Sequence, residues 1–188
     1  MIIIFEGADG VGKTTLAKEL NLRLANSMYM KRTPTFKYKD ANTFYHCVVD
    51  LTRSSEYDWR FMLDMISKPC EEFNFIFDRS FITQAVYQNA IGQWTKHPTL
   101  TSILSSYHAH LASLPHIVFN IKRSNFIKTD DSYDLVHDKQ HLIVNEYDKW
   151  VEYEDTKQLF VVTLDTSILS EEECMTHILQ HIANYNNK

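Results

Sequence analysis

The sequence has 188 residues, 44% hydrophobic and 23% charged, which is typical of a folded globular protein rather than a disordered or fibrous chain. Nineteen basic residues against 24 acidic ones give a net charge of −5, which argues against a general nucleic-acid-binding coat and leaves a local basic patch open. Three widely spaced cysteines (Cys47, Cys70, Cys174) suggest no disulfide framework or metal-type pair, so we expect a reducing, cytoplasmic location (the host cytoplasm if the source is viral).

Short β-branched and aromatic runs alternate with helical patterns along the chain. The first run is too short to span a membrane and has no basic leader before it, so we expect no membrane association. The alternation predicts one α/β domain over residues 1–188, with a parallel sheet flanked by helices in three layers. The expected strands are Ile2–Phe5, Phe73–Phe77, Ile117–Ile121 and Leu159–Leu164, and the expected helices follow the first glycine-rich stretch and cover Ile82–Ile91, Leu100–Leu111, Leu135–Val151 and Glu171–Ala183, with a further helix near Asp58–Met65.

Three of the four glycines lie in one stretch directly after the first expected strand. That stretch fits the phosphate-loop pattern G-x-x-x-x-G-K-[ST] at every fixed position, between a strand and a helix. Glycines let successive backbone N–H groups point inward at phosphate oxygens, and the following helix adds the positive end of its dipole. The pattern predicts a site for ATP with Mg²⁺, formed by Gly7, Ala8, Asp9, Gly10, Val11, Gly12, Lys13, Thr14 and Thr15.

Two residues of this stretch have expected tasks in binding the triphosphate. Lys13 should bridge the β- and γ-phosphates, and the Thr14 hydroxyl should ligate Mg²⁺. Asp9 would repel phosphates unless its carboxylate points elsewhere. It either accepts a hydrogen bond from a sugar hydroxyl of the acceptor or simply favours the turn.

Two segments, the first of which contains the glycine-rich stretch, make the sequence resemble the thymidylate kinase family. Residues 5–15, FEGADGVGKTT, are similar to the opening of that family, and the segment Asp78–Gln88 resembles its DR(Y/H)xxSxxAYQ motif. Weaker similarities lie at Asp131–Asp134 with Tyr147, and at Leu164–Ser167. The resemblance implies a P-loop kinase fold with a short lid at about residues 122–134.

The resemblance also implies roles for individual residues. Asp78 would organise Mg²⁺ or its water, or act as a base if the acceptor is an alcohol. Arg79 would clamp the acceptor phosphate. The alternative is that Asp78 and Arg79 form a structural ion pair. Lys13 completes the expected catalytic set. Arg32 would also contact the acceptor phosphate, and Thr83 and Gln88 would hydrogen-bond the pyrimidine edge. The candidate residues of the lid are Lys122, Arg123 and Lys128. The alternative for these three is a solvated basic loop.

The departures from the family pattern lie on the acceptor side. The family's Gly-Gly after the arginine segment is replaced here by Thr35-Phe36-Lys37. Residues 29–39 also mix basic and aromatic side chains without an acid, as in surfaces that bind single-stranded nucleic acid. The alternative is a mobile acceptor loop with ordinary surface charge. Trp59, Arg60 and Phe61 are the candidates for stacking on a base.

We therefore expect an ATP-dependent kinase of a thymidine-type deoxynucleotide, dTMP or a related pyrimidine dNMP. The alternative is a phage kinase that phosphorylates the 5-hydroxymethyl group of 5-hydroxymethyl-deoxyuridine in modified viral DNA, which requires an extruded or single-stranded base. A nucleotide-dependent switch is a minor alternative, although the N-K-x-D tetrad of guanine-specific switches does not occur. The sequence leaves a homodimer open.

Overall fold

The computed structural model describes residues 1–31, 58–67, 73–90, 98–124 and 140–187. Within these residues a five-stranded parallel sheet forms, in the order β2-β3-β1-β4-β5. The expected α/β class with a parallel sheet is confirmed. The strands are β1 (Ile2–Glu6), β2 (Ser27–Lys31), β3 (Asn74–Asp78), β4 (His116–Lys122) and β5 (Val161–Asp165).

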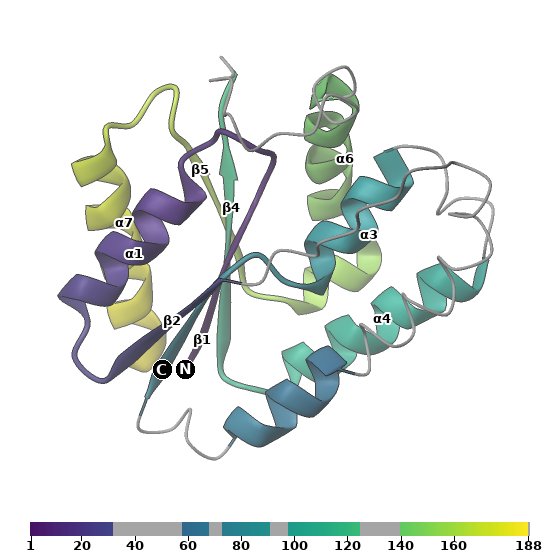
Figure 1. Ribbon diagram of the computed structural model, residues 1–188, viewed down its shortest axis with the longest axis horizontal. Coiled ribbons are helices and arrows are strands. Elements are labelled where there is room, and N and C mark those ends of the chain that lie inside the picture. Colours follow the sequence, from purple (N-terminus) through teal and green to yellow (C-terminus); the bar gives the residue numbers. More distant parts are fainter. Residues whose placement is uncertain (32–57, 68–72, 91–97, 125–139, 188) are drawn as a thin grey trace.

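Helices cover both faces of this sheet, which gives the expected three layers (Figure 1). The helices α1 (Lys13–Arg23) and α7 (Glu171–Asn186) lie together on one face. On the other face lie α3 (Phe81–Ala90), α4 (Pro98–Ala112) and α6 (Gln140–Glu152). A short 3₁₀ helix, η3 (Glu154–Gln158), follows α6, and residues 58–67 are also helical.

The sequence did not predict β2. Its residues, SMYMK, contain no β-branched side chain, and most of them are only half-buried because the strand lies at the end of the sheet order, beside β3. Burial on both faces, by contrast, makes central strands read as continuous apolar runs. The expected strand that began at Leu159 starts instead at Val161, because η3 and its capping residue occupy the preceding positions.

The strand β1 is buried along its whole length because β3 and β4 flank it and helices cover both faces. Its register places Phe5 beside Asp78 of β3 and Glu6 beside Asn120 of β4. The carboxyl ends of three neighbouring strands therefore meet at one edge of the sheet. Segments that follow these strands can place their side chains together at this edge.

Beneath this edge, aromatic side chains hold α4 and α6 against each other. The indole of Trp150 donates a hydrogen bond from Nε1 to Nε2 of His108 at 3.3 Å, and both residues are fully buried. Burial lowers the pKa of His108 to about 4, so the ring is neutral at neutral pH. In the part of the chain that the structure describes, no helix is long and apolar enough to cross a membrane.

The buried His108 should make the protein sensitive to acid. Its pKa is about 4 in the folded state and about 6.5 when exposed, so the unfolded chain binds more protons between these values. The free energy of unfolding should therefore fall as the pH falls from 6.5 toward 4, by up to about 1.4 kcal/mol per pH unit.

His108→Gln keeps an acceptor for Trp150 and removes this titration, so its stability should fall less steeply with acid. Urea unfolding at several pH values between 4.5 and 7 measures the slope. The exposed His141 on α6 offers the matched control, His141→Gln, which should keep the wild-type slope. An unchanged slope in the His108 variant would contradict this origin of the acid sensitivity.

Candidate active site

The glycine-rich stretch forms a tight loop between β1 and α1. Gly7, Gly10 and Gly12 have φ angles of 135°, 74° and 95°, a region that side chains with a Cβ rarely adopt. At Gly7 an added Cβ would lie 2.0 Å from the backbone oxygen of Ile121 in β4. The loop therefore packs directly against the neighbouring strand, which explains the glycine at this position.

Several carbonyl groups of this loop accept hydrogen bonds from side chains, three of which come from other parts of the fold. Loops of this kind bind anions through their backbone N–H groups, and a carbonyl that already accepts a hydrogen bond is held in a fixed position. Loop carbonyls accept hydrogen bonds as follows: Gly7 from Arg79 Nη1 at 3.4 Å, Ala8 from Lys13 Nζ, Asp9 from Gln140 Nε2 at 2.7 Å, and Val11 from Thr166 Oγ1 at 2.9 Å.

Lys13 begins α1 and is 5% exposed. Burial, followed by the nearby Arg79 cation, lowers the pKa of Lys13 to about 7. Asp9, Asp78 and Glu6 act in the opposite direction. An anion bound in the loop would favour the charged ammonium further, since it would replace part of the lost solvation.

Thr14 and Asp78 lie side by side, one from α1 and the other from the carboxyl end of β3. The Thr14 hydroxyl donates to Asp78 Oδ2 at 2.5 Å, and Tyr29 of β2 donates to the same oxygen at 3.1 Å. Hydroxyl and carboxylate oxygens are ligands that Mg²⁺ accepts beside phosphate oxygens, so this pair fits the expected metal. Among the described residues, no three His, Cys, Asp or Glu side chains gather in a group that could hold a metal.

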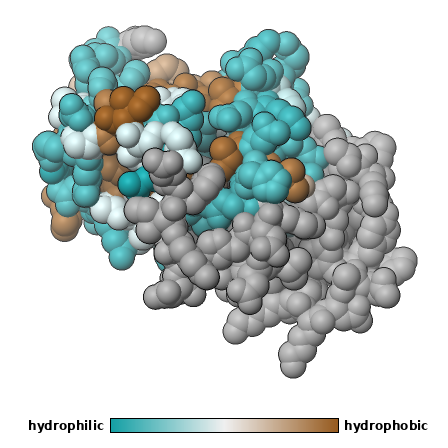
Figure 2. Space-filling view, turned by 90° about the horizontal axis from the view of Figure 1, so that it is seen from above, coloured by the Kyte–Doolittle hydropathy of each residue, from teal (hydrophilic) through white to brown (hydrophobic). Residues whose placement is uncertain are grey.

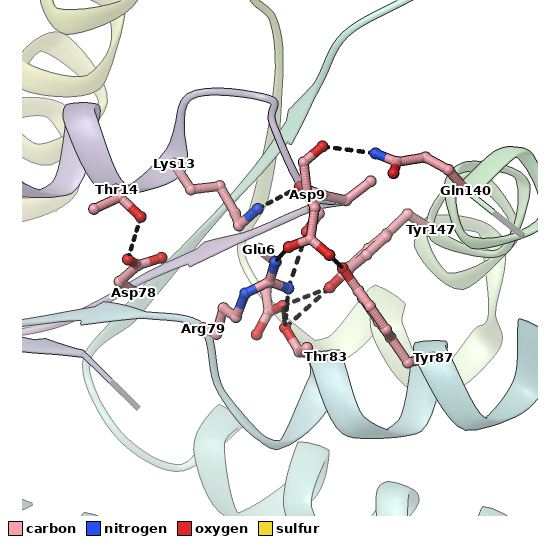
Figure 3. A network of polar contacts seen from close by, with 12 residues as sticks. Glu6, Asp9, Lys13, Thr14, Asp78, Arg79, Thr83, Tyr87, Gln140 and Tyr147 are labelled. Carbon is pink, nitrogen blue, oxygen red and sulfur yellow. Dashed lines mark hydrogen bonds and ion pairs between the residues drawn. The ribbon is translucent and has the colours of Figure 1, made fainter. Parts of the chain in front are cut away.

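Arg79 follows β3 with a φ of 79°, and its guanidinium turns toward the phosphate loop (Figure 3). Its Nη2 forms an ion pair with Asp9 Oδ1, and its Cζ lies 5.3 Å from the centre of the Tyr87 ring. The Tyr87 hydroxyl donates to the other carboxylate oxygen of Asp9 at 2.9 Å. Asp9 is therefore turned to Arg79 and Tyr87, which reduces its repulsion of phosphates in the loop.

Behind the loop, the buried carboxylate of Glu6 binds the start of α3 and the middle of α6. It accepts hydrogen bonds from Ser80, from the Thr83 hydroxyl at 2.5 Å and from the Tyr147 hydroxyl at 3.0 Å. Burial raises the pKa of Tyr147 well above its ordinary value, so this hydroxyl remains a donor. Thr83 is only 4% exposed and its hydroxyl is engaged within the protein.

The other expected site residues lie in different surroundings. Gln88 of α3 is 6% exposed, Lys122 ends β4 and is exposed, and Arg123 follows it half-buried. Trp59 is in the core, where it packs edge-on against Phe77 with ring centres 5.5 Å apart, so it does not offer the stacking surface suggested above. Arg32, Lys128, residues 125–134 of the lid and the segment after Lys31 lie outside the described residues.

Three residues of this network had no expected role. Glu6 and Tyr29 were part of segments already noted, but a single acid or tyrosine carries no sign of what it contacts across the sheet. Gln140 bonds a loop that is 131 positions away in the chain. Glu6 ends β1 and Gln140 begins α6, which could have marked these two as candidates, whereas Tyr29 lies in the middle of the unpredicted β2 and carried no such sign.

The described residues on the face above the sheet edge are largely polar at the surface (Figure 2). Figure 2 shows the molecule from above the view of Figure 1, and its coloured part is mostly hydrophilic, with hydrophobic side chains in small groups. A polar surface suits a site for a charged ligand more than a docking face for an apolar partner.

Comparison of the structure with solved structures finds similarity over nearly the whole chain, whereas no family model and no curated protein matches the sequence. A thymidylate kinase from Ehrlichia chaffeensis is 16% identical, with 97% of this chain and 98% of that chain covered and a TM-score of 0.61. A deoxyadenosine kinase from M. mycoides with bound dCTP is 16% identical, with 98% and 100% covered and a TM-score of 0.59. The YorR protein of Bacillus subtilis, in complex with phosphorylated GDP, is 17% identical, with 100% and 98% covered and a TM-score of 0.63.

These similarities establish the architecture. The strand order, the phosphate loop between β1 and α1, and the helices on both faces are those of a P-loop kinase fold. The fold implied by the sequence resemblance is confirmed.

The two outer glycines of the loop should respond differently to alanine. Gly7→Ala adds a Cβ against the β4 backbone at a positive φ, so strain and overpacking together should cost about 3–5 kcal/mol of unfolding free energy. Gly12→Ala has a positive φ but no atom within 4 Å of its Cβ, and should cost about 1–2 kcal/mol. Urea unfolding compares the two, and equal losses would show that the contact with Ile121 is unimportant.

Proposed function

We propose that this protein is an ATP-dependent kinase that transfers the γ-phosphate to a thymidine-type deoxynucleotide, dTMP or a related pyrimidine dNMP. The observation that carries the proposal is the convergence of Lys13, the Thr14–Asp78 pair and Arg79 on one side of the phosphate loop (Figure 3). Phosphoryl transfer needs little covalent help from the protein and depends on positioned positive charge and a metal ion.

On the donor side, the backbone N–H groups of the loop and the Lys13 ammonium would hold the phosphates of ATP. Thr14 and Asp78 would hold Mg²⁺, which supplies positive charge to the phosphate oxygens when bound. Tyr29 would keep the Asp78 carboxylate in place through its hydrogen bond to Oδ2. The beginning of α1 adds its dipole to the same anion site.

On the acceptor side, Arg79 would contact the acceptor phosphate next to the transferring group, where a fixed cation offsets the developing charge. Arg32 would contact the same phosphate, and Thr83 and Gln88 would line the side of the base. Thr83 would do so while its hydroxyl donates to Glu6. The lid over residues 122–134, with Lys122, Arg123 and Lys128, would exclude water as a competing acceptor. A homodimer stays a prediction.

A second candidate acceptor is a hydroxyl group, and the Asp9–Arg79 pair favours it. Because Asp9 already neutralises the guanidinium, an acceptor without a phosphate would not have to displace this carboxylate. The hydroxymethyl group of 5-hydroxymethyl-deoxyuridine in viral DNA and a free deoxynucleoside are both acceptors of this kind. In that case Asp78 would serve as the base.

Removing the lysine of the loop should separate activity from folding. Lys13→Ala should lower turnover by about 10²–10³-fold, because the variant lacks the ammonium that meets the transferring phosphate. Radiolabel transfer from ATP measures turnover, and circular dichroism measures folding. Lys18→Ala, an exposed lysine of the same helix, is the matched control and should keep wild-type turnover. Turnover like that of wild type in Lys13→Ala would exclude the proposed donor site.

The acceptor should be found with a panel that receives the same labelled ATP. The panel contains dTMP, dCMP, the free nucleosides thymidine and deoxyadenosine, and single-stranded DNA that contains 5-hydroxymethyluracil. We expect the label in dTMP. Label that appears only in the DNA would show that the acceptor is the modified base in DNA and not a free nucleotide. Label that appears only in a nucleoside would show that the protein is a nucleoside kinase. ATP binding without transfer to any acceptor would support the switch.

A further inference from the structure

Glu6 is a buried acid that the proposed donor and acceptor sites do not use. It ends β1, directly before the phosphate loop, and has no solvent exposure. Its two carboxylate oxygens face different neighbours: Oε1 faces Ser80, and Oε2 faces Thr83 and Tyr147. The side chain thus lies between the loop, the start of α3 and α6.

The side of Glu6 that faces Ser80 can only accept hydrogen bonds. The backbone N–H of Ser80, a fixed donor, lies 2.7 Å from Oε1. The Ser80 hydroxyl accepts from the N–H of Ile82 at 3.1 Å, as a cap of α3, and donates its own proton to Oε1 at 2.6 Å. An oxygen is therefore required at this position of the side chain.

The other side of Glu6 sets the direction of the Thr83 hydroxyl. An ionised carboxylate has no proton to give, so Thr83 must donate to Oε2 at 2.5 Å. The Thr83 Oγ1 oxygen then accepts from Arg79 Nη1 at 3.4 Å, and the Tyr147 hydroxyl lies 3.0 Å from the same oxygen. The hydrogen bonds run in one direction, from Arg79 to Thr83 to Glu6 (Figure 3).

We propose that Glu6 is a positioning residue of the kinase: as a pure acceptor it turns the Thr83 hydroxyl toward itself and so holds the Arg79 guanidinium at the phosphate loop. This inference rests on the proposed function, in which Arg79 acts on the acceptor. Burial raises the pKa of Glu6, whereas the hydrogen bonds from Ser80, Thr83 and Tyr147 and the nearby Arg79 cation act in the opposite direction and favour the carboxylate that the relay needs.

The decisive variant is Glu6→Gln, which has nearly the same shape. Because the N–H and hydroxyl of Ser80 are both donors, the amide oxygen must face Ser80, and the amide NH₂ must face Thr83 and Tyr147. Thr83 and Tyr147, whose hydroxyls lie 3.0 Å apart, then both accept from the glutamine, and since only one of them can donate to the other, one hydroxyl proton is left without an acceptor beside Arg79, which has only donors. The network reverses although the packing is kept.

We expect Glu6→Gln to lower kcat by at least tenfold, with KM for ATP within threefold of wild type and a melting temperature that does not fall. Glu146→Gln, a buried acid of α6 that bonds Asn89 and Tyr153, is the matched control and should keep the wild-type kcat. A merely structural role of Glu6 would instead lower kcat and melting temperature together. That outcome, or a wild-type kcat in Glu6→Gln, would overturn the proposal.

The Thr83 hydroxyl offers an independent test that leaves the Glu6 carboxylate in place, should Glu6→Gln not fold. Thr83→Val should lose activity as Glu6→Gln does, and the double variant should lose no more than the worse single variant. Thr83→Ser restores the hydroxyl and should restore most of kcat. If Thr83→Ser is as impaired as Thr83→Val, or if the two losses multiply, the relay does not exist.

A readout without activity keeps the two proposals apart. If wild-type protein transfers phosphate to no acceptor in the panel, the proposed kinase function fails, but the relay can still be measured. NMR of the Arg79 guanidinium protons should show slow exchange with water in wild type and faster exchange in Glu6→Gln and Thr83→Val. Equal exchange in all three proteins would overturn the role of Glu6 whatever the enzyme assays show.

Discussion

The absence of a side chain at Gly7 is the constraint on which the rest of the site depends. The chain leaves β1 next to the backbone of β4, and only a residue without a Cβ can pass Ile121 at this distance. This passage directs the next five residues over the carboxyl edge of the sheet and begins α1 at Lys13. The phosphate loop, the dipole of α1 and the place of Lys13 all follow from this close approach.

The second requirement of the site is a balance of buried charge. Lys13 and Arg79 are cations that lie close enough for Arg79 to lower the pKa of Lys13. Lys13 is 5% exposed and the Arg79 side chain is 12% exposed, so both are largely buried. Asp9, Asp78 and Glu6 supply the opposite charge from three directions. Such an arrangement keeps positive charge available at the loop without an uncompensated cation in the core, and it suits a ligand that brings negative charge.

Much of this could be predicted from the sequence because the signals are local. The glycine pattern marks the loop, and apolar runs mark the central strands with Asp78 and Arg79 directly after one of them. The edge strand β2 lacked such a run because it is half-buried. The partners of Asp9, Glu6 and Thr83 could not be predicted, since hydrogen bonds across more than 60 positions of the chain depend on how α3 and α6 pack.

The bonds from Asp9 to Arg79 and Tyr87, and from the Asp9 carbonyl to Gln140, have a consequence for protein engineering. The loop is recognisable by its own short motif, yet it is not a portable module. Transplanted into another scaffold without these partners, it would carry an unpaired carboxylate beside the phosphates. A working graft would have to include the residues that bind Asp9, which come from three separate parts of the fold. The motif alone would therefore not transfer the function of the loop.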